Sequence, residues 1–141
     1  MTTYVIGDLH GHLEPYQRLL QQQGLCDEQL NWSGGAHQLW LIGDFFDRGA
    51  SGIGCLELTM KLQQQAPDHG GLVNALLGNH ELMLLCARRF QDQQFNGVPV
   101  VDIWRRWGGI DEDLSQLDDT HEAFIRSLPA MALVNDQLLI H

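Results

Sequence analysis

The sequence of 141 residues is poor in basic side chains. Its 8 Lys and Arg residues stand against 18 Asp and Glu residues, which gives a formal net charge of −10 with histidine neutral. Bulk charge of this sign repels nucleic acid and anionic membranes, which argues against a protein that coats either surface. An anionic substrate would therefore need local positive charge, and bound metal cations can provide it.

Paired cysteines and long apolar runs are also missing. Cys26, Cys55 and Cys86 have no paired spacing and an odd total, which argues against a disulfide framework or a cysteine zinc site and indicates buried, reduced thiols. No window approaches the ~20 apolar residues of a membrane span. The N-terminus also lacks the basic stretch and apolar run of a signal peptide. We therefore predict a soluble cytoplasmic protein with no membrane or nucleic-acid partner.

Despite these absences, the sequence can form a folded domain with a core. Hydrophobic residues make up 44% of it, and a globular chain of this length buries roughly 68–70% of its unfolded surface. Short apolar runs that end at a glycine alternate with stretches of helical periodicity. We predict strands over residues 4–6, 38–42 and 72–77, each followed by a helix, over residues 13–23, 52–65 and 81–90. This alternation is typical of parallel βαβ units.

Beyond these units the pattern changes. Residues 100–107 have helical periodicity that ends at a Gly-Gly pair, and the Trp-Arg-Arg-Trp cluster at 104–107 is interpreted as helix packing by tryptophans with solvated arginines. The acidic stretch at 111–113 is interpreted as a solvated loop. Neither feature is assigned a functional role.

The C-terminal residues predict a helix and a hairpin. Asp119 and Glu122 have the spacing of a capping box, which predicts that a helix begins there. Apolar residues at 131–134 and 137–140 flank the pair Asn135-Asp136. Two short strands around such a pair predict a β-hairpin.

Polar residues suited to metal binding or acid–base chemistry follow each of the first three predicted strands. They are Asp8 and His10 after the first strand, Asp44, Asp47 and Arg48 after the second, and Asn79 and His80 after the third. The carboxyl ends of parallel strands meet along one edge of a sheet, where ligands bind. We therefore expect these residues, about 35 positions apart in sequence, to lie in one crevice.

The residue types suit a divalent cation. Asp8 and His10 alternate around Leu9, so on an extended segment both point the same way. Asp44 could bridge two ions because a carboxylate has two oxygens with about four acceptor directions. Asn79 offers an amide oxygen, a hard ligand. Mixed imidazole and oxygen ligands favour manganese, iron or zinc over calcium.

The three motifs together carry a family resemblance. Gly7-Asp8-Leu9-His10-Gly11, Gly43-Asp44-Phe45-Phe46-Asp47-Arg48-Gly49 and Gly78-Asn79-His80-Glu81 resemble the signature motifs of the calcineurin-like metallophosphoesterases. The second motif is most similar to that of the phosphoprotein phosphatase branch, which hydrolyses phosphoserine and phosphothreonine. The resemblance implies an α/β fold, a metallophosphoesterase-type β-sandwich flanked by helices. It also implies that residues 1–141 are one such domain, truncated on its C-terminal side.

The resemblance assigns metal ligands. Asp8 and His10 would hold a first ion, Asp44 would bridge two ions, and Asn79 and His141 would hold the second. Two divalent ions are implied, with manganese favoured and iron, zinc, cobalt or magnesium as alternatives. Between them they would lower the pKa of a water and so supply a metal-bridging hydroxide.

The resemblance also assigns catalytic residues. His80 would protonate the leaving group as a general acid, and Asp47 would orient it. Arg48 would grip phosphate oxygens with its planar fork, and Asn79 and His80 would also bind the substrate phosphate. Glu81 fits the family pattern, but an acid at a helix N-terminus explains it equally well, so it is assigned no catalytic role.

The function expected from these assignments is hydrolysis of phosphate monoesters in a phosphorylated protein or a small phosphoester. Two alternatives stay open. One is a diadenosine tetraphosphate hydrolase, against which Asp47 counts because those relatives typically lose this carboxylate. The other is a non-catalytic truncated domain, because the family carries a further metal-binding His motif downstream that has no counterpart here.

Overall fold

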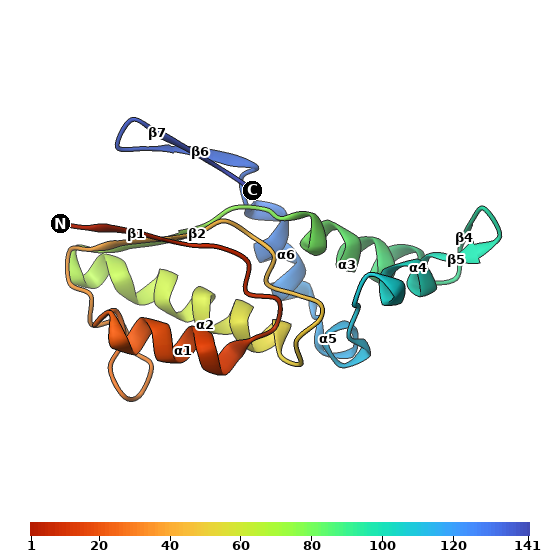
Figure 1. The fold of residues 1–141 in the computed structure, drawn as a ribbon, viewed down its shortest axis with the longest axis horizontal. Helices are drawn as coiled ribbons and strands as arrows, with labels where there is room; N and C mark the ends of the chain where they lie inside the picture. The colour runs from red at the N-terminus through yellow and green to blue at the C-terminus, as the bar shows by residue number, and fades with distance from the viewer.

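The computed structural model describes residues 1–141 and has a small parallel sheet at its centre (Figure 1). The sheet consists of β1 (Thr3–Ile6), β2 (Gln38–Leu41) and β3 (Leu72–Ala75), in the order β1-β2-β3. Tyr4 pairs with Leu39, and Leu39 pairs with Val73, both in parallel register. The predicted βαβ units and the α/β fold are therefore confirmed, with the second and third strands ending one and two residues earlier than predicted.

Helices connect these strands and continue beyond them. They are α1 (Leu13–Gln22), α2 (Gly52–Gln65), the 3-10 turn η1 (Ala66–His69), α3 (Asn79–Phe90), α4 (Val100–Arg106), α5 (Asp111–Gln116) and α6 (Asp119–Ser127). Helix α3 begins two residues earlier than predicted, so the third motif occupies a helix N-terminus. No helix is long and apolar enough to cross a membrane.

The two faces of the sheet bury different residues. Leu39 and Leu41 belong to the main core beneath the sheet, where α1 and α2 pack, whereas Trp40 belongs to a smaller cluster on the opposite face. This division follows from the alternation of side chains along a strand. The helix side carries most of the core, because all but three of the clustered buried hydrophobic residues lie there.

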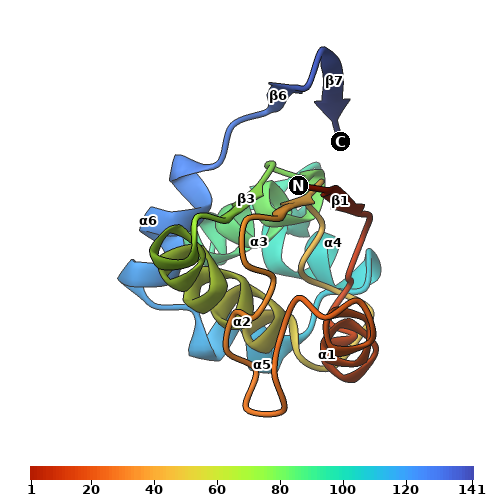
Figure 2. The same cartoon turned by 90° about the vertical axis from the view of Figure 1, so that its left-hand side faces the viewer.

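A hairpin covers part of the opposite face. Its strands are β6 (Met131–Val134) and β7 (Gln137–Ile140), as predicted, and they pair with each other but not with the parallel sheet. Figure 2 shows the hairpin on the side of the sheet away from α1 and α2. The expected sandwich has a second sheet, and on this face the structure shows a separate two-stranded sheet, β6-β7.

The hairpin buries one face and exposes the other. Val134 packs with Trp40 and Leu76, whereas Leu133 and Leu138, which face each other across the two strands, are 74% and 60% exposed. The hairpin therefore presents an apolar outer surface.

Two local predictions from the C-terminal third are wrong. Residues 111–113 begin α5 instead of forming a solvated loop, and Asp113 is 2% exposed. The cap of α6 is Asp118, whose carboxylate accepts the backbone N–H of His121, so the capping residue lies one position before the predicted one. Burial selected Asp113 among the neighbouring acids, whereas Asp118 is exposed and caps α6 through a local bond to His121.

Two further features differ from the sequence expectation. Residues 94–99 form a small hairpin, β4 (Gln94–Phe95) and β5 (Val98–Pro99), that was not predicted. Cys26 and Cys55 are buried as expected, but Cys86 is exposed. Cys86 lies on α3, away from the main core, which explains the difference.

Candidate active site

The predicted site residues come from four segments that meet at the carboxyl edge of the sheet. They are Asp8 and His10 after β1, Asp44, Asp47 and Arg48 after β2, Asn79 and His80 in the first turn of α3, and His141 after β7. Asp44 lies at the centre, since its carboxylate is near His10, His141 and the backbone of His80. The predicted convergence of the strand ends is confirmed.

Glycines allow the motif loops to approach one another. Gly49 donates its N–H to the carbonyl of His10 at 2.8 Å, and a side chain at Gly49 would overlap that backbone. Gly43 has φ +100, and a Cβ there would lie 2.6 Å from the backbone nitrogen of Gly78. Glycine at these two positions therefore allows the backbone of the second loop to pack directly against the backbones of the first and the third.

The site also concentrates left-handed backbone. Of eight non-glycine residues with positive φ, four are site residues: His10 (43°), Asp44 (56°), Asp47 (72°) and Arg48 (73°). Such conformations cost about 1–3 kcal/mol each and persist where surrounding contacts enforce them. Their concentration here indicates that the fold holds these side chains in set directions.

One group of ligand atoms surrounds His10. Its Nε2 lies 3.6 Å from Oδ2 of Asp8 and 3.7 Å from Oδ2 of Asp44. Its Nδ1 lies 2.8 Å from the carbonyl oxygen of Phe46 and donates its hydrogen there. A neutral imidazole then has its Nε2 lone pair directed at the two carboxylates, as a metal-binding histidine requires.

A second group surrounds His141. Its Nδ1 donates to the carbonyl oxygen of Ile42 at 2.8 Å, so Nε2 again carries the lone pair of a neutral ring. This Nε2 lies 3.4 Å from Oδ1 of Asp44 and 2.9 Å from Oδ1 of Asn79. With the ring hydrogen on Nδ1, the three neighbouring atoms, Nε2 of His141 and the Oδ1 atoms of Asp44 and Asn79, are all acceptors. A cation between them would stabilise this arrangement.

These distances fit metal binding. Ligand atoms that each bind one ion at ~2.0–2.2 Å are separated by roughly 3–4 Å. The separations of His10 from Asp8 and Asp44, and of His141 from Asp44, lie in this range. The two oxygens of Asp44 face different histidines, His10 and His141. The donor set of carboxylate, imidazole and amide oxygen suits two neighbouring divalent ions that share Asp44.

Comparison with known proteins agrees with this geometry. The chain matches the family described as calcineurin-like phosphoesterase over residues 1–137. It belongs to that family.

Curated relatives of this calcineurin-like phosphoesterase include two kinds of enzyme. It is 31% identical to Shewanella-like protein phosphatase 2 of Arabidopsis thaliana, over 89% of the chain and 34% of that protein. It is 30% identical to a symmetrical bis(5′-nucleosyl)-tetraphosphatase of Glaesserella parasuis, over 100% of the chain and 44% of that protein. The chain therefore spans less than half the length of these relatives.

A solved structure matches the fold. The cold-active protein-tyrosine phosphatase of a psychrophilic Shewanella species superposes with a TM-score of 0.72 at 28% identity, over 99% of the chain and 43% of that protein. The resemblance seen in the three motifs thus extends to the whole architecture.

An acid–base pair lies beside the ligand groups of this calcineurin-like phosphoesterase. His80 Nδ1 is 2.7 Å from Oδ2 of Asp47, which leaves Nε2 of His80 free. The other carboxylate oxygen of Asp47 accepts the indole N–H of Trp104 at 3.0 Å. Burial raises the pKa of Asp47, while the hydrogen bonds from His80 and Trp104 act in the opposite direction.

Glu81 has a role that the sequence interpretation missed. Its buried carboxylate accepts three backbone N–H groups, from Asp44 (2.9 Å), Phe45 (2.7 Å) and Gly78 (2.8 Å). It therefore joins the second motif to the third and orients the backbone of Asp44. Burial raises the pKa of Glu81, and these hydrogen bonds lower it. Its capping-box position, three residues after Gly78, was the available signal.

Arg48 differs from the other predicted site residues. It is exposed, and its guanidinium has no hydrogen bond or ion pair, while its backbone N–H donates to the carbonyl of Gly108 at 2.7 Å. The structure thus fixes the backbone of Arg48 and leaves its side chain free to contact a ligand.

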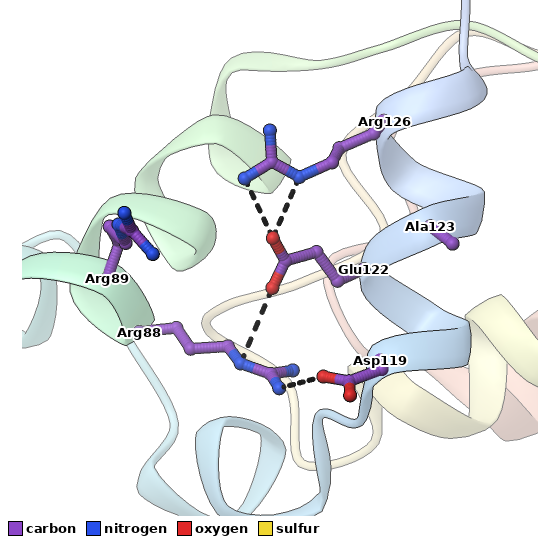
Figure 3. A pocket seen from close by; sticks show the side chains of 6 residues that line it. All are labelled: Arg88, Arg89, Asp119, Glu122, Ala123 and Arg126. Atoms are coloured by element: carbon purple, nitrogen blue, oxygen red, sulfur yellow. Dashed lines mark hydrogen bonds and ion pairs between the residues drawn. The ribbon is translucent and has the colours of Figure 1, made fainter.

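A cavity lies away from the motifs, between α3 and α6. It measures about 590 Å³ and is lined mainly by charged residues (Figure 3): Arg88, Arg89, Asp119, Glu122, Ala123 and Arg126. Arg88 pairs with Asp119 at 2.8 Å, and Arg126 pairs with Glu122 at 2.7 Å. In these pairs the charges of the arginines and the acids offset each other. None of the motif residues lines the cavity, so it is not the candidate active site.

Proposed function

We propose that this chain carries the metal-binding and acid–base residues of a metal-dependent phosphoester hydrolase that cleaves phosphate monoesters. The main support is the environment of Asp44, whose two carboxylate oxygens face His10 and His141 while the His80–Asp47 pair lies alongside. The two sets of His and carboxylate side chains in this chain that are close enough to hold a metal ion both lie here and share Asp44: one is His10, Asp44 and His80, and the other is Asp8, Asp44 and His141.

The proposed ligands are Asp8, His10 and Asp44 for one divalent ion, and Asp44, Asn79 and His141 for the other. Bound there, the ions would polarise a phosphoryl oxygen and make a nearby water more acidic, with manganese favoured and iron, zinc, cobalt or magnesium also compatible with these ligands. The hydrogen bonds of His10 and His141 to backbone carbonyls hold each Nε2 toward the ligand position.

The chain's own residues supply the remaining chemistry. Nε2 of His80 is the atom that would hand a proton to the leaving oxygen, and such proton transfer typically contributes 10²–10⁴-fold. Asp47 holds His80 through Nδ1 and stabilises the protonated ring. The free guanidinium of Arg48 would grip two phosphate oxygens, and Asn79 would assist in holding the phosphate.

The substrate class is proposed from similarity together with Asp47. Relatives named as protein phosphatases support a phosphorylated protein, and Asp47 retains its hydrogen bond to His80. The full-length match to a symmetrical tetraphosphatase supports a dinucleoside tetraphosphate as the second candidate. In both candidates water attacks phosphorus, but the bond that breaks is a phosphate ester in the first and a phosphoanhydride in the second.

We further propose that residues 1–141 form the first part of a longer metallophosphoesterase domain. Support comes from the share of the relatives' length that the chain covers, 34–44% in the two compared above. The exposed apolar residues of the β6–β7 hairpin agree with further structure packing there.

The test is metal-dependent hydrolysis of an aryl phosphate by the full-length protein, after removal of bound metal and addition of single dications. Asp44→Asn should lower kcat/KM by more than about 100-fold, because even outer-shell partners of a metal are worth 10–100-fold. Asp136→Asn is the matched control, the same chemical change in the exposed turn of the hairpin. No hydrolysis with any metal, or equal activity in the two variants, would contradict the proposal.

A second assay separates the substrate candidates. A phosphoserine peptide and a dinucleoside tetraphosphate are offered at equal concentration, and the products are identified by chromatography. We expect inorganic phosphate from the peptide at the higher kcat/KM. Nucleoside diphosphate as the dominant product would instead support the tetraphosphatase.

A further inference from the structure

The carboxylate of Asp47 accepts two hydrogen bonds, one at each oxygen. His80 Nδ1 occupies Oδ2 at 2.7 Å, and Trp104 Nε1 occupies Oδ1 at 3.0 Å. All three side chains are buried, and Trp104 comes from α4, 57 residues after Asp47. An indole N–H can only donate, so it holds one carboxylate oxygen without competing for the proton of His80.

The backbone around Asp47 needs such support. Asp47 and Arg48 are consecutive left-handed residues, a strained pair that surrounding contacts must enforce. The segment from Trp104 to Gly108 contacts both of them, through the indole N–H at Asp47 and through the Gly108 carbonyl at the N–H of Arg48. The end of α4 therefore fixes both the turn and the carboxylate.

We propose that Trp104 is a positioning residue that acts through Asp47 to keep His80 oriented for proton donation to the leaving group. This inference rests on the proposed function of the site. A carboxylate with only one donor can rotate and carry the imidazole with it, whereas donors on both oxygens fix its plane. Removal of the indole N–H therefore loosens Nε2 of His80.

The chain contains matched indoles for comparison. Trp32 is equally buried, but its N–H donates to the carbonyl of Gly35 at 3.1 Å, in the loop that precedes β2 and so lies at the opposite end of that strand from the second motif. Trp40 is buried with no partner for its N–H. Substitution of Trp32 by phenylalanine thus removes a buried indole hydrogen bond without touching the acid–base pair.

The experiment compares Trp104→Phe with Trp32→Phe in the full-length protein, on two phosphomonoesters that differ in leaving group. Phenyl phosphate requires a proton at its leaving oxygen, whereas 2,4-dinitrophenyl phosphate leaves without one. For Trp104→Phe we expect kcat to fall about 10-fold on phenyl phosphate and less than about 2-fold on the dinitrophenyl ester, with KM nearly unchanged. Trp32→Phe should leave kcat on both esters nearly unchanged.

A second variant removes the N–H without changing the packing. β-(3-benzothienyl)alanine, introduced at position 104, keeps the bicyclic shape and replaces the N–H by sulfur. It should reproduce the selective loss on phenyl phosphate. An equal loss on both esters, or a loss no larger than that of Trp32→Phe, would overturn the proposal.

Nuclear magnetic resonance provides a readout that does not require activity. The Nδ1 proton of His80 should be observed in the wild type and in Trp32→Phe, and should shift or broaden through faster exchange in Trp104→Phe. An unchanged His80 signal would refute the positioning role. If the wild type hydrolysed neither ester, the proposed function would fail, and this signal would still decide whether Trp104 orients the pair.

Discussion

Asp113 provides a sharp test of how the chain supports its second motif. Its buried carboxylate accepts the backbone N–H groups of Gly52 (3.1 Å) and Ile53 (3.0 Å) at the start of α2. Ser51, the N-cap residue, makes no side-chain cap, so Asp113 takes its place, 60 residues after Ile53 in the sequence. Asp113→Ala leaves both N–H groups buried without an acceptor, at about 1–3 kcal/mol each. We expect it to lower the free energy of unfolding by about 2–4 kcal/mol.

The assay is urea unfolding, with Glu112→Ala as the control. Glu112 is an exposed acid in the same helical turn, and its carboxylate accepts a hydrogen bond only from the exposed side chain of Gln116. Its loss should therefore cost little more than the helix-dipole contribution, about 0.3–1 kcal/mol. Equal effects of the two substitutions, or a loss below about 1 kcal/mol for Asp113→Ala, would refute the capping role.

The effect of Asp113→Ala has a predicted pH dependence. Burial raises the folded-state pKa of Asp113 above its unfolded value. The stabilisation that depends on this shift is therefore complete below the unfolded-state pKa and is lost as the pH rises through the folded-state pKa. The difference between wild type and Asp113→Ala should be larger at about pH 4 than at about pH 7. A difference that grows with pH would show that burial does not dominate at Asp113.

Three further predictions concern other contacts. Glu81→Gln should lower the free energy of unfolding by about 2 kcal/mol, measured in urea, because an amide cannot accept all three N–H groups that the carboxylate binds. Burial raises the pKa of Cys26 to about 11 and that of Cys55 to about 12, so at about pH 8 a thiol reagent should modify the exposed Cys86 rapidly and the other two only after denaturation. Gly49→Ala should lower the free energy of unfolding by about 1–3 kcal/mol or more, and with it the melting temperature, because the added Cβ would overlap the backbone of the first motif. An unchanged melting temperature would contradict the packing of these loops.

The sequence was sufficient to predict the features that depend on local pattern. The strands before Gly7, Gly43 and Gly78 follow from apolar runs that end at glycine, and parallel connection then brings the residues after them to one edge. The hairpin follows from its turn, since Asn135 and Asp136 both adopt positive φ as a two-residue loop requires. In each case the decisive residues are neighbours in sequence.

Features that depend on distant partners could not be predicted in this way. In the sequence, Trp104 fits simple helix packing, and only the fold brings its N–H to Asp47. Asp113 is one of three neighbouring acids, and only its contact with α2 distinguishes it. Glu81 matched an ordinary helix N-terminus, although its carboxylate also binds the backbone of Asp44 and Phe45. No local periodicity encodes such contacts, because burial and long-range packing decide them.

The distribution of buried charge bears on how an acidic chain could accept the proposed phosphate substrate. The four buried carboxylates, Asp44, Asp47, Glu81 and Asp113, all lie on or against the motif loops, and none pairs with a lysine or arginine. Backbone N–H groups, imidazoles and one indole bind their oxygens instead, which leaves the charge itself uncompensated. Divalent cations shared through Asp44 would offset this charge and, together with the exposed Arg48, would attract a phosphate that the net charge of −10 otherwise repels.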